Sequence, residues 1–323
     1  MDVIIESHIP FIAGELERRN HRVTYLPPEE ITAQTVKNAN ALIIRTRTRV
    51  DHALLHGSRV RHVATATIGT DHIDMTYCRN NGIAVSNAPG CNAPAVAQYV
   101  ISSLAAIVGP ERLPGMTLGI VGVGNVGRTV ERWARGIGMN LMLCDPPRAK
   151  AEGTGNFVSI SDIAECADAI TFHTPLDRTT RHLCDRRLLS ACRRQPVVIN
   201  AARGSVADNG ALIAALHDRR IRAVAIDCWE GEPAIDPILL SLSAVATPHI
   251  AGYSIEGKMR ASAMAAKAID PEINMSIPPA AISPALDAIL ASYSPAADTM
   301  ALRAAPQNFE ALRNNYNYRN EPN

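Results

Sequence analysis

The chain has 323 residues, which is more than one typical hydrophobic core holds, so we predict two domains. Hydrophobic residues make up 47% of the chain, which is enough to form a core in each domain. Its formal net charge of +1 gives no overall field for nucleic acid or for a membrane surface, so neither is an expected partner. No apolar run approaches the ~20 residues of a membrane span, and no charged start precedes an apolar signal core. The expected location is therefore cytoplasmic.

The seven cysteines are scattered through the sequence and odd in number. They lack the C-x-x-C and Cys/His spacings that are typical of metal sites. We therefore interpret them as reduced thiols of the core and expect no metal site.

Strand-like apolar runs alternate with helix-like segments, which is typical of parallel sheets covered by helices. In the first part of the chain, strands are predicted over residues 2–5, 23–26, 41–45, 62–66 and 83–86, with a helix over residues 11–20. After a turn at residues 88–90, apolar residues at helical spacing predict a helix over 93–108 that leads into a larger second part.

The second part predicts a doubly wound sheet, with strands over residues 117–121, 141–144, 169–172, 197–200, 223–227 and 244–246. From residue 277 onward, prolines at 278, 279, 284, 295 and 306 interrupt an alanine-rich sequence. Any helices in this last segment must therefore be short.

A glycine-rich turn, V-G-V-G-N-V-G, begins at the end of the strand predicted over 117–121. Gly122 would allow the tight turn, Gly124 would let the backbone approach a pyrophosphate, and Gly127 would let the next helix pack on the sheet. The amides of Asn125 and Val126 would lie at the helix start, where the helix dipole also attracts an anion. The turn therefore predicts a dinucleotide-binding unit.

Asp145 ends the next predicted strand, eighteen residues past Gly127. A carboxylate there accepts hydrogen bonds from a ribose diol and repels a 2′-phosphate, which favours NAD over NADP. The expected fold class is α/β, with two doubly wound parallel-sheet domains. A smaller flavodoxin-like substrate domain would span residues 1–91 and a Rossmann-type NAD-binding domain residues 92–265, with a return helix and a short tail over 266–323.

Three polar clusters follow later strands, in the motifs I-N-A-A-R-G at 199–204, D-C-W-E-G-E-P at 227–233 and T-P-H-I-A-G-Y at 247–253. Ligands of open α/β sheets bind at strand carboxyl ends, so Arg203, Glu232 and His249 are predicted to surround one crevice. Histidine, with an ordinary pKa near ~6.5, suits the proton transfer that accompanies hydride transfer at a carbinol carbon. Glu232 would orient that histidine, and Arg203 would bind a substrate carboxylate through two hydrogen bonds.

Together with A-T-A-T-I-G-T-D-H-I-D at 64–74, A-P-G-C-N-A at 88–93 and L-C-D-P-P-R at 143–148, these motifs resemble the D-isomer-specific 2-hydroxyacid dehydrogenases over residues 2–260. The resemblance implies NAD-dependent oxidation of a small phosphorylated D-2-hydroxy acid, with Arg203 and Glu232 in the active site and His249 as proton donor or acceptor. It also implies substrate contacts from Thr46, Thr67 and Tyr253, and NAD contacts from Asp145, Thr174, Ala201, Ala202, Arg203, Asp227 and Gly252.

The resemblance also implies a homodimer. The family members that share these motifs carry a C-terminal dimerisation domain, and here residues 309–318 resemble only a piece of it.

Arg45, Arg47 and Arg49 alternate along the sequence and would share one face if the strand predicted over 41–45 continued through them. A cluster of guanidinium groups suits a phosphate, so Arg45 and Arg47 are candidate substrate-binding residues. An equally weighted interpretation is that these arginines coat the solvated face of an edge strand.

Two further functions remain open at this point. The same three polar side chains would serve another D-2-hydroxyacid dehydrogenase, for example one acting on 3-phosphoglycerate or glycerate. A non-catalytic NAD-sensing binding protein on the same scaffold is the other alternative, and the absence of a basic patch in the sequence argues against it.

Overall fold

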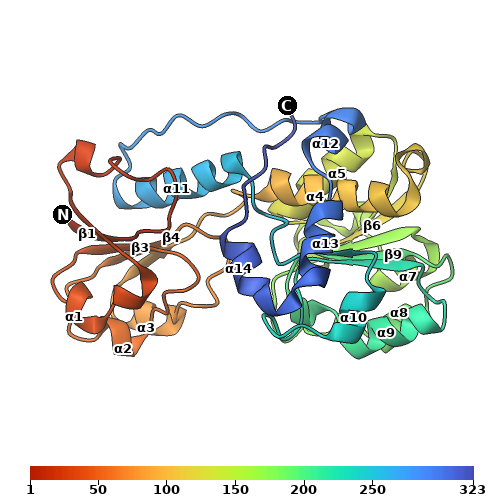
Figure 1. The fold of residues 1–323 in the computed structure, drawn as a ribbon, viewed down its shortest axis with the longest axis horizontal. Coiled ribbons are helices and arrows are strands. Elements are labelled where there is room, and N and C mark those ends of the chain that lie inside the picture. The colour runs from red at the N-terminus through yellow and green to blue at the C-terminus, as the bar shows by residue number, and fades with distance from the viewer. The chain divides into compact units, whose positions relative to one another are not determined.

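The computed structural model describes residues 1–323, which fold into two compact units. The first unit comprises residues 1–92 and 255–279, and the second comprises residues 93–254 and 280–323. Each unit contains one parallel sheet with helices on both faces, so the predicted α/β class with two parallel-sheet domains is confirmed (Figure 1). All eleven predicted strands are present, with ends that differ by at most one residue from the prediction.

The sheet of the first unit has five strands in the order β2-β1-β3-β4-β5, which is the flavodoxin-like order. Its strands are β1 (Asp2–Glu6), β2 (Arg22–Leu26), β3 (Ala41–Ile44), β4 (His62–Thr65) and β5 (Ala84–Ser86). Its helices are α1 (Ala33–Val36), α2 (His52–Leu55), α3 (Met75–Asn80) and α11 (Ile255–Ile269). One face packs on α1, α2 and α3, and the other packs on α11 and residues 9–16.

The helix predicted over residues 11–20 is wrong. That segment is a series of turns with one 3₁₀ helix at Glu17–Arg19. Phe11 and Gly14 have φ angles of 62° and 81°, in the left-handed region that an α-helix cannot contain. Ile12 and Leu16 of this segment are nevertheless buried against the sheet, which explains the apolar spacing that suggested a helix.

The sheet of the second unit has six parallel strands in the order β11-β10-β9-β8-β6-β7. Its strands are β6 (Thr117–Val121), β7 (Asn140–Cys144), β8 (Ala169–Phe172), β9 (Val197–Asn200), β10 (Ala223–Ile226) and β11 (Val245–Ala246). The order reverses between β6 and β8, and such a switch point is where open α/β sheets bind ligands.

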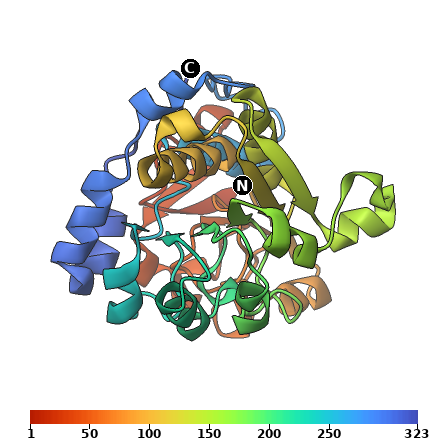
Figure 2. The same cartoon turned by 90° about the vertical axis from the view of Figure 1, so that its right-hand side faces the viewer.

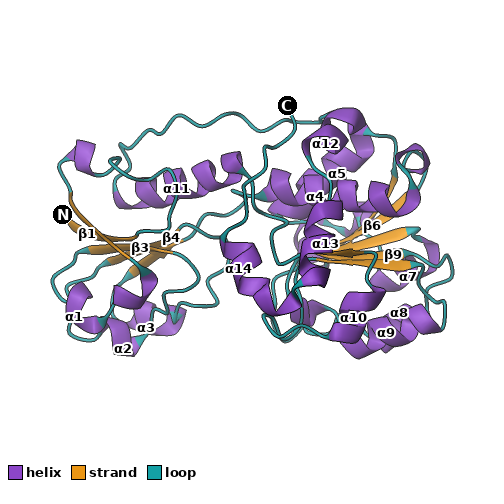
Figure 3. Cartoon of the chain, viewed as in Figure 1, coloured by secondary structure: helices purple, strands orange, loops and turns teal.

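Helices cover both faces of this second sheet (Figures 2 and 3). One face packs on α4 (Ala93–Val108), α5 (Asn125–Gly136) and α12 (Leu286–Ser292). The other face packs on α7 (Ile160–Cys166), α8 (Arg186–Ser190), α9 (Asn209–His217), α10 (Pro237–Leu242), α13 (Ala296–Ala304) and α14 (Phe309–Asn314). The short helix α6 (Pro146–Glu152) directly follows β7. The remaining 3₁₀ helices span Pro28–Glu30, Pro110–Arg112, Thr154–Asn156, Gly204–Val206 and Pro306–Asn308.

The C-terminal segment contains only short helices, as its prolines predicted, but it packs into the second unit. Leu302 of α13 and Phe309 of α14 are fully buried in the core beneath the sheet. The helix α11 lies with the first unit, whereas the sequence-based division at residue 265 placed most of it in the NAD-binding domain. Ala261, Ala265 and Ala266 of that helix are small enough to pack closely on the first sheet. None of the helices combines the length and the apolar character needed to span a bilayer.

Candidate active site

Each of the three glycines in the turn between β6 and α5 suits its position for a different structural reason. Gly122 has a φ of +87°, and a Cβ there would lie 2.8 Å from the backbone of His173. A Cβ on Gly127 would lie 2.1 Å from the carbonyl oxygen of Gly122, so only glycine lets α5 approach the turn. A Cβ on Gly124 would meet no atom within 4 Å, so the space above that residue is open. No side chain caps the α5 amides at Asn125 and Val126, so this helix start can accept an anion.

Asp145 is fixed beside this turn by backbone amides. Its Oδ2 accepts a hydrogen bond from Val123 N at 2.8 Å, and its Oδ1 accepts one from Arg148 N at 3.1 Å as the cap of α6. The guanidinium of Arg148 donates to Glu152 at 2.7 and 2.8 Å and to Val123 O at 2.9 Å. Because Arg148 is engaged in these contacts, Asp145 remains the dominant charge at the end of β7, in agreement with the preference for a diol over a phosphate.

Thr174 provides an independent test of whether a ligand fits next to the glycine turn. Its Cγ2 is among the atoms nearest to Gly122, and its Oγ1 is buried without a hydrogen-bond partner. A buried hydroxyl without a partner costs about 1–3 kcal/mol, so such an atom calls for an acceptor or donor from a bound group. The residues around the turn therefore fit a dinucleotide.

The loop after β9 is attached to the loop after β10. Asn200 is buried, and its Nδ2 donates to the carbonyl oxygens of Arg203 at 3.0 Å and Cys228 at 3.2 Å. A Cβ on Gly204 would lie 2.0 Å from Trp229 O, so glycine is required for this close approach. Asn200 and Gly204 belong to the motif at residues 199–204, but the sequence did not predict that they hold these two loops together. Ala201 and the buried Ala202 lie on the same loop, at the carboxyl end of β9.

Asp227 is a buried carboxylate, 1% exposed, that holds the loop after β11. It accepts hydrogen bonds from Ile250 N at 2.7 Å, Ala251 N at 3.0 Å and the Thr247 hydroxyl at 2.7 Å. Burial raises the pKa of Asp227, while these hydrogen bonds and the charge of His249 act in the opposite direction. The structure thus gives the side chain of Asp227 a positioning role, and its predicted NAD contact stays a prediction.

His249 and Glu232 form a hydrogen-bonded pair. Nδ1 of His249 lies 2.6 Å from Oε1 of Glu232, and the other carboxylate oxygen of Glu232 accepts from Trp229 N at 3.1 Å. His249 has a φ of 57°, an uncommon conformation for a residue with a side chain, and Asp227 O accepts its backbone N–H at 2.9 Å. Such a conformation costs of order 1 kcal/mol and persists only where the surroundings fix it.

The charge state of Glu232 determines which atoms of His249 are available. Burial alone would raise the pKa of Glu232, but the hydrogen bond and charge of His249, the Trp229 amide and the charge of Arg313 together lower it. An ionised carboxylate can only accept, so Nδ1 of His249 carries a proton and donates it to Glu232. Nε2 of the neutral imidazole is then left to accept a proton from a substrate.

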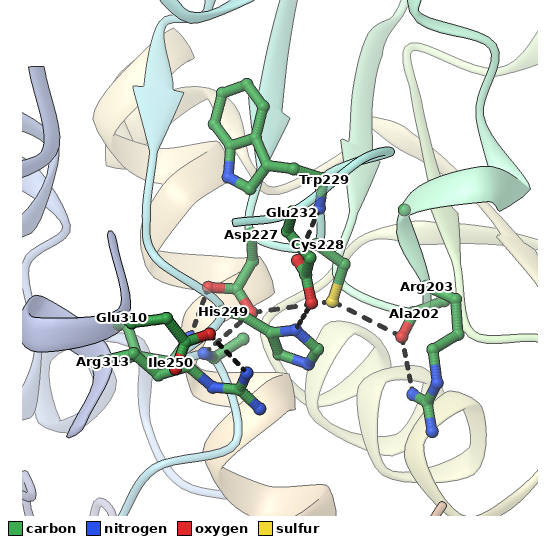
Figure 4. Close-up of polar contacts among 12 residues, drawn as sticks. Ala202, Arg203, Asp227, Cys228, Trp229, Glu232, His249, Ile250, Glu310 and Arg313 are labelled. Atoms are coloured by element: carbon green, nitrogen blue, oxygen red, sulfur yellow. Dashed lines mark hydrogen bonds and ion pairs between the residues drawn. The ribbon is translucent and has the colours of Figure 1, made fainter. Parts of the chain in front are cut away.

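Figure 4 shows how the side chains around this pair are arranged. His249 lies between the side chains of Arg203 and Arg313 in this view. Arg203 donates from Nη1 to Ala202 O at 2.8 Å, and the thiol of Cys228 donates to that same oxygen at 3.4 Å (Figure 4). The predicted residues Arg203, Glu232 and His249 are thus brought to the carboxyl ends of β9, β10 and β11 of one sheet.

Tyr253 and Gly252 end the same loop as His249. The hydroxyl of Tyr253 accepts a hydrogen bond from Nε of Arg313 at 3.2 Å, and its ring packs edge-on against Tyr316 and Tyr318. Arg313 and Arg319, which both lie in the C-terminal segment near this loop, were not predicted as site residues. Arg313 falls within residues 309–318, whose resemblance to a dimerisation domain gave no sign of a contact with Tyr253, because that contact depends on how the segment folds back.

The remaining predicted site residues belong to the first unit, at the carboxyl ends of β3 and β4. β3 ends at Ile44, so Arg45, Arg47 and Arg49 do not continue a strand, and the expectation of one shared strand face is wrong. Arg45 donates from Nη1 to His8 O at 2.9 Å, and Arg49 donates to Asp51 at 3.0 Å. Thr46 follows Arg45 in the same turn, and the Thr67 hydroxyl lies 2.6 Å from that of Thr65.

A hollow of about 480 Å³ lies elsewhere in the second unit, at the amino ends of the strands. It is lined by Arg112, Met116, Asp168, Arg194, Val197 and Arg222. It holds no residue of the glycine turn or of the Glu232 and His249 pair, so it is not the candidate active site.

The comparison with known proteins agrees with this geometry. A family model described as D-isomer specific 2-hydroxyacid dehydrogenase, NAD binding domain, matches residues 102–251. The chain belongs to the D-isomer-specific 2-hydroxyacid dehydrogenases, and the predictions of this family, of an NAD-dependent dehydrogenase and of NAD as cofactor are confirmed.

Its relatives include individual enzymes of known name. The chain is 42% identical over 338 residues to the erythronate-4-phosphate dehydrogenase of Bacteroides thetaiotaomicron, with 99% of this chain and 97% of that protein covered. It is 40% identical over 341 residues to the erythronate-4-phosphate dehydrogenase of Porphyromonas gingivalis, with coverages of 98% and 92%. Among solved structures, the TT0316 protein of Thermus thermophilus superposes with a TM-score of 0.72 at 27% identity, covering 91% of this chain and 98% of that one.

Proposed function

We propose that this chain catalyses the NAD-dependent oxidation of 4-phospho-D-erythronate to 2-oxo-3-hydroxy-4-phosphobutanoate, a step in pyridoxal phosphate (vitamin B6) biosynthesis. Relatives that it matches over nearly their whole length carry the name of this activity. The observation in the structure that supports it most is the 2.6 Å contact between His249 Nδ1 and Glu232 Oε1 at the carboxyl end of a doubly wound sheet.

The proton transfer is assigned to His249. In the oxidation direction, its neutral Nε2 removes the proton of the C2 hydroxyl, and the resulting imidazolium is stabilised by the ionised Glu232. NAD, when bound at the glycine turn, would accept the hydride that leaves C2. In the reverse direction, the same imidazolium returns the proton to the 2-oxo group.

Arg203 is assigned to the substrate carboxylate. Its planar guanidinium can hold that group through two hydrogen bonds, and the adjacent positive charge polarises the oxygen on C2. Asp145 and Thr174, together with the glycine turn, are the cofactor-binding residues that we propose for NAD. The backbone of Ala201, Ala202 and Gly252 and the side chain of Asp227 complete that set by resemblance to the family.

Thr46, Thr67, Arg45 and Arg47 of the first unit remain proposed substrate-binding residues. Their support is the family resemblance for the two threonines and the affinity of guanidinium groups for phosphate for the two arginines. If Arg45→Glu and Arg47→Glu each leave the KM for the phosphorylated acid unchanged, the phosphate site in the first unit is excluded.

A homodimer in the cytoplasm is proposed as the working form of the enzyme. The homodimer is supported by the resemblance of residues 309–318 to a piece of the dimerisation domain that related family members carry. Light scattering on the purified protein at micromolar concentration tests the dimer, and a monomer at that concentration would contradict it.

The experiment that tests the proposed activity follows NADH absorbance with purified protein, NAD and a carbonyl trap. The substrates compared are 4-phospho-D-erythronate, 3-phosphoglycerate, D-glycerate and D-lactate. We expect the highest kcat/KM with 4-phospho-D-erythronate. Preference for another acid would keep the catalytic pair but replace the substrate, and binding of NAD without turnover of any acid would overturn the enzymatic function.

A further inference from the structure

The C-terminal segment of the second unit brings an arginine to the catalytic pair. Arg313 of α14 has a side chain that is only 20% exposed, and its Nε donates to the Tyr253 hydroxyl at 3.2 Å. Its positive charge contributes to the low pKa of Glu232. In the view of Figure 4, the side chain of His249 lies between Arg203, from the loop after β9, and Arg313, from α14.

The contacts of Arg313 leave most of its binding capacity unused. Besides the hydrogen bond from Nε, its Nη1 forms an ion pair with Oε1 of Glu310 at 3.8 Å, a distance longer than that of a hydrogen bond. A guanidinium offers five N–H donors in a planar fork that matches a phosphate or carboxylate. Several donors of Arg313 are thus available to an acceptor that binds next to His249.

The segment that carries Arg313 is anchored at both ends. Phe309, at the start of α14, is fully buried in the core of the second unit. Beyond Arg313, the buried Arg319 donates to Gln98 Oε1 at 2.7 Å and to Ile250 O at 3.0 Å, one residue past His249. Arg313 is therefore held in a defined position and is not a mobile surface arginine.

We infer that Arg313, together with the Tyr253 hydroxyl, binds the phosphate group of the substrate, in addition to the contacts proposed for Arg45 and Arg47. This inference rests on the proposed function, because 4-phospho-D-erythronate carries anionic groups on both sides of its reacting C2 carbon. With the carboxylate on Arg203 and the C2 hydroxyl on His249, the phosphate end of the molecule extends away from Arg203. In Figure 4, Arg313 lies on the side of His249 opposite to Arg203. A largely buried guanidinium binds phosphate through charge-assisted hydrogen bonds that water screens only weakly.

The test compares wild type with Arg313→Gln, Arg313→Lys and the control Gln307→Ala. Gln307 lies in the 3₁₀ helix just before α14, and its side chain is exposed. Each protein is assayed with 4-phospho-D-erythronate and with D-erythronate, and inorganic phosphate is tested as a competitive inhibitor against the phosphorylated acid. Thermal melting shows that each variant is folded.

For Arg313→Gln we expect the KM for 4-phospho-D-erythronate to rise about 10- to 100-fold, because a hydrogen-bonded charge is lost. The kcat/KM for D-erythronate should change by less than about 3-fold, and inhibition by inorganic phosphate should weaken in parallel with the rise in KM. Arg313→Lys should give an intermediate KM, since lysine keeps the charge and loses the fork. Gln307→Ala should match the wild type.

Two results would overturn the inference but not the proposed function. An equal fall in kcat/KM for both acids in Arg313→Gln and Arg313→Lys would show that Arg313 only positions Tyr253 and Glu232. An unchanged KM and unchanged phosphate inhibition would show that it does not contact the phosphate. A wild type that does not prefer the phosphorylated acid would instead reject the proposed function, and the inference with it.

Discussion

Each of the two sheets has a buried acidic side chain at its carboxyl edge, and this side chain accepts hydrogen bonds from the loop after a neighbouring strand. In the first unit, Glu6 at the end of β1 is 1% exposed and accepts Arg45 N at 2.9 Å and the Thr48 hydroxyl at 3.1 Å. In the second unit, Asp227 after β10 is equally buried and accepts two amides and the Thr247 hydroxyl. The same strand geometry thus positions an arginine turn in one unit and a histidine loop in the other.

The two buried carboxylates differ in how many of their oxygen atoms accept hydrogen bonds. Both oxygens of Asp227 accept backbone amides, whereas Oε1 of Glu6 is buried without a hydrogen-bond partner. The loop that Asp227 holds also contains a residue with positive φ, His249, and carries the proton-transfer pair. A doubly wound sheet provides a place for a site where its strand order reverses. The comparison indicates that the number of hydrogen bonds donated to one buried carboxylate determines how firmly the loop at that place is held.

The largest expected effect separates the chemical roles of the two loops. His249→Ala removes the proposed base, so kcat should fall by about 10²- to 10⁴-fold, with little change in the affinity for NAD. Arg45→Glu, in the matching loop of the first unit, should raise the KM for the phosphorylated acid and leave kcat near that of wild type. Steady-state kinetics measure both, and near-normal turnover by His249→Ala would show that the proton transfer is wrongly assigned.

The second effect tests whether the two buried carboxylates contribute different amounts to the free energy of unfolding. Asp227→Asn replaces an acceptor of two amides with a side chain that must turn an NH₂ group toward one of them, so the free energy of unfolding should fall by about 2–4 kcal/mol. Glu6→Gln disturbs fewer hydrogen bonds and should cost about 1 kcal/mol. Denaturant unfolding gives both values. Equal losses would mean that the number of donors on each carboxylate does not explain how these loops are held.

The third effect concerns the first strand of each sheet, since only β6 is followed by a glycine turn. Gly127→Ala forces a Cβ to within 2.1 Å of Gly122 O and should destabilise the protein by about 1–3 kcal/mol. Gly124→Ala places its Cβ in open space, so the melting temperature should be unchanged while the affinity for NAD falls about 10-fold. Calorimetric melting and titration with NAD separate the two variants. Normal NAD binding by a folded Gly124→Ala would place the pyrophosphate elsewhere.

The smallest effect is a shift in pH dependence. The pKa of Glu232 is lowered, so this carboxylate is ionised from below its ordinary value of 4.5 upward and faces the imidazole throughout the working range. Because the hydrogen bond and charge of His249 are among the causes that lower the pKa of Glu232, ionised Glu232 stabilises the folded protein above its ordinary pKa, and this contribution is lost as the pH falls. Glu232→Gln should therefore make the melting temperature fall less steeply below about pH 4.5 than in the wild type. Melting curves measured across this pH range test the prediction, and an unchanged fall would show that the two groups are not coupled.

Much of the fold could be predicted because its signals are local. Each strand of both sheets is a short apolar run, and burial on both faces makes such runs nearly continuous. The segment over residues 11–20 has the same kind of local signal, and it misled the prediction, because buried side chains at helical spacing do not reveal a left-handed φ at Phe11. In the candidate site, Arg203, Glu232 and His249 were found because each follows a strand directly in the sequence.

The sequence by itself determined the α/β class, the glycine turn, the strand ends that carry the polar motifs and the family to which the chain belongs. These features depend on residue type and spacing over stretches of a few residues. The tertiary structure decided that Asp227 holds the His249 loop, that Thr174 Oγ1 is buried next to the turn and that Arg313 reaches Tyr253 from the C-terminal segment. These contacts join residues far apart in the chain, and their geometry is fixed only when burial removes water and leaves the protein's own donors and acceptors to pair with one another.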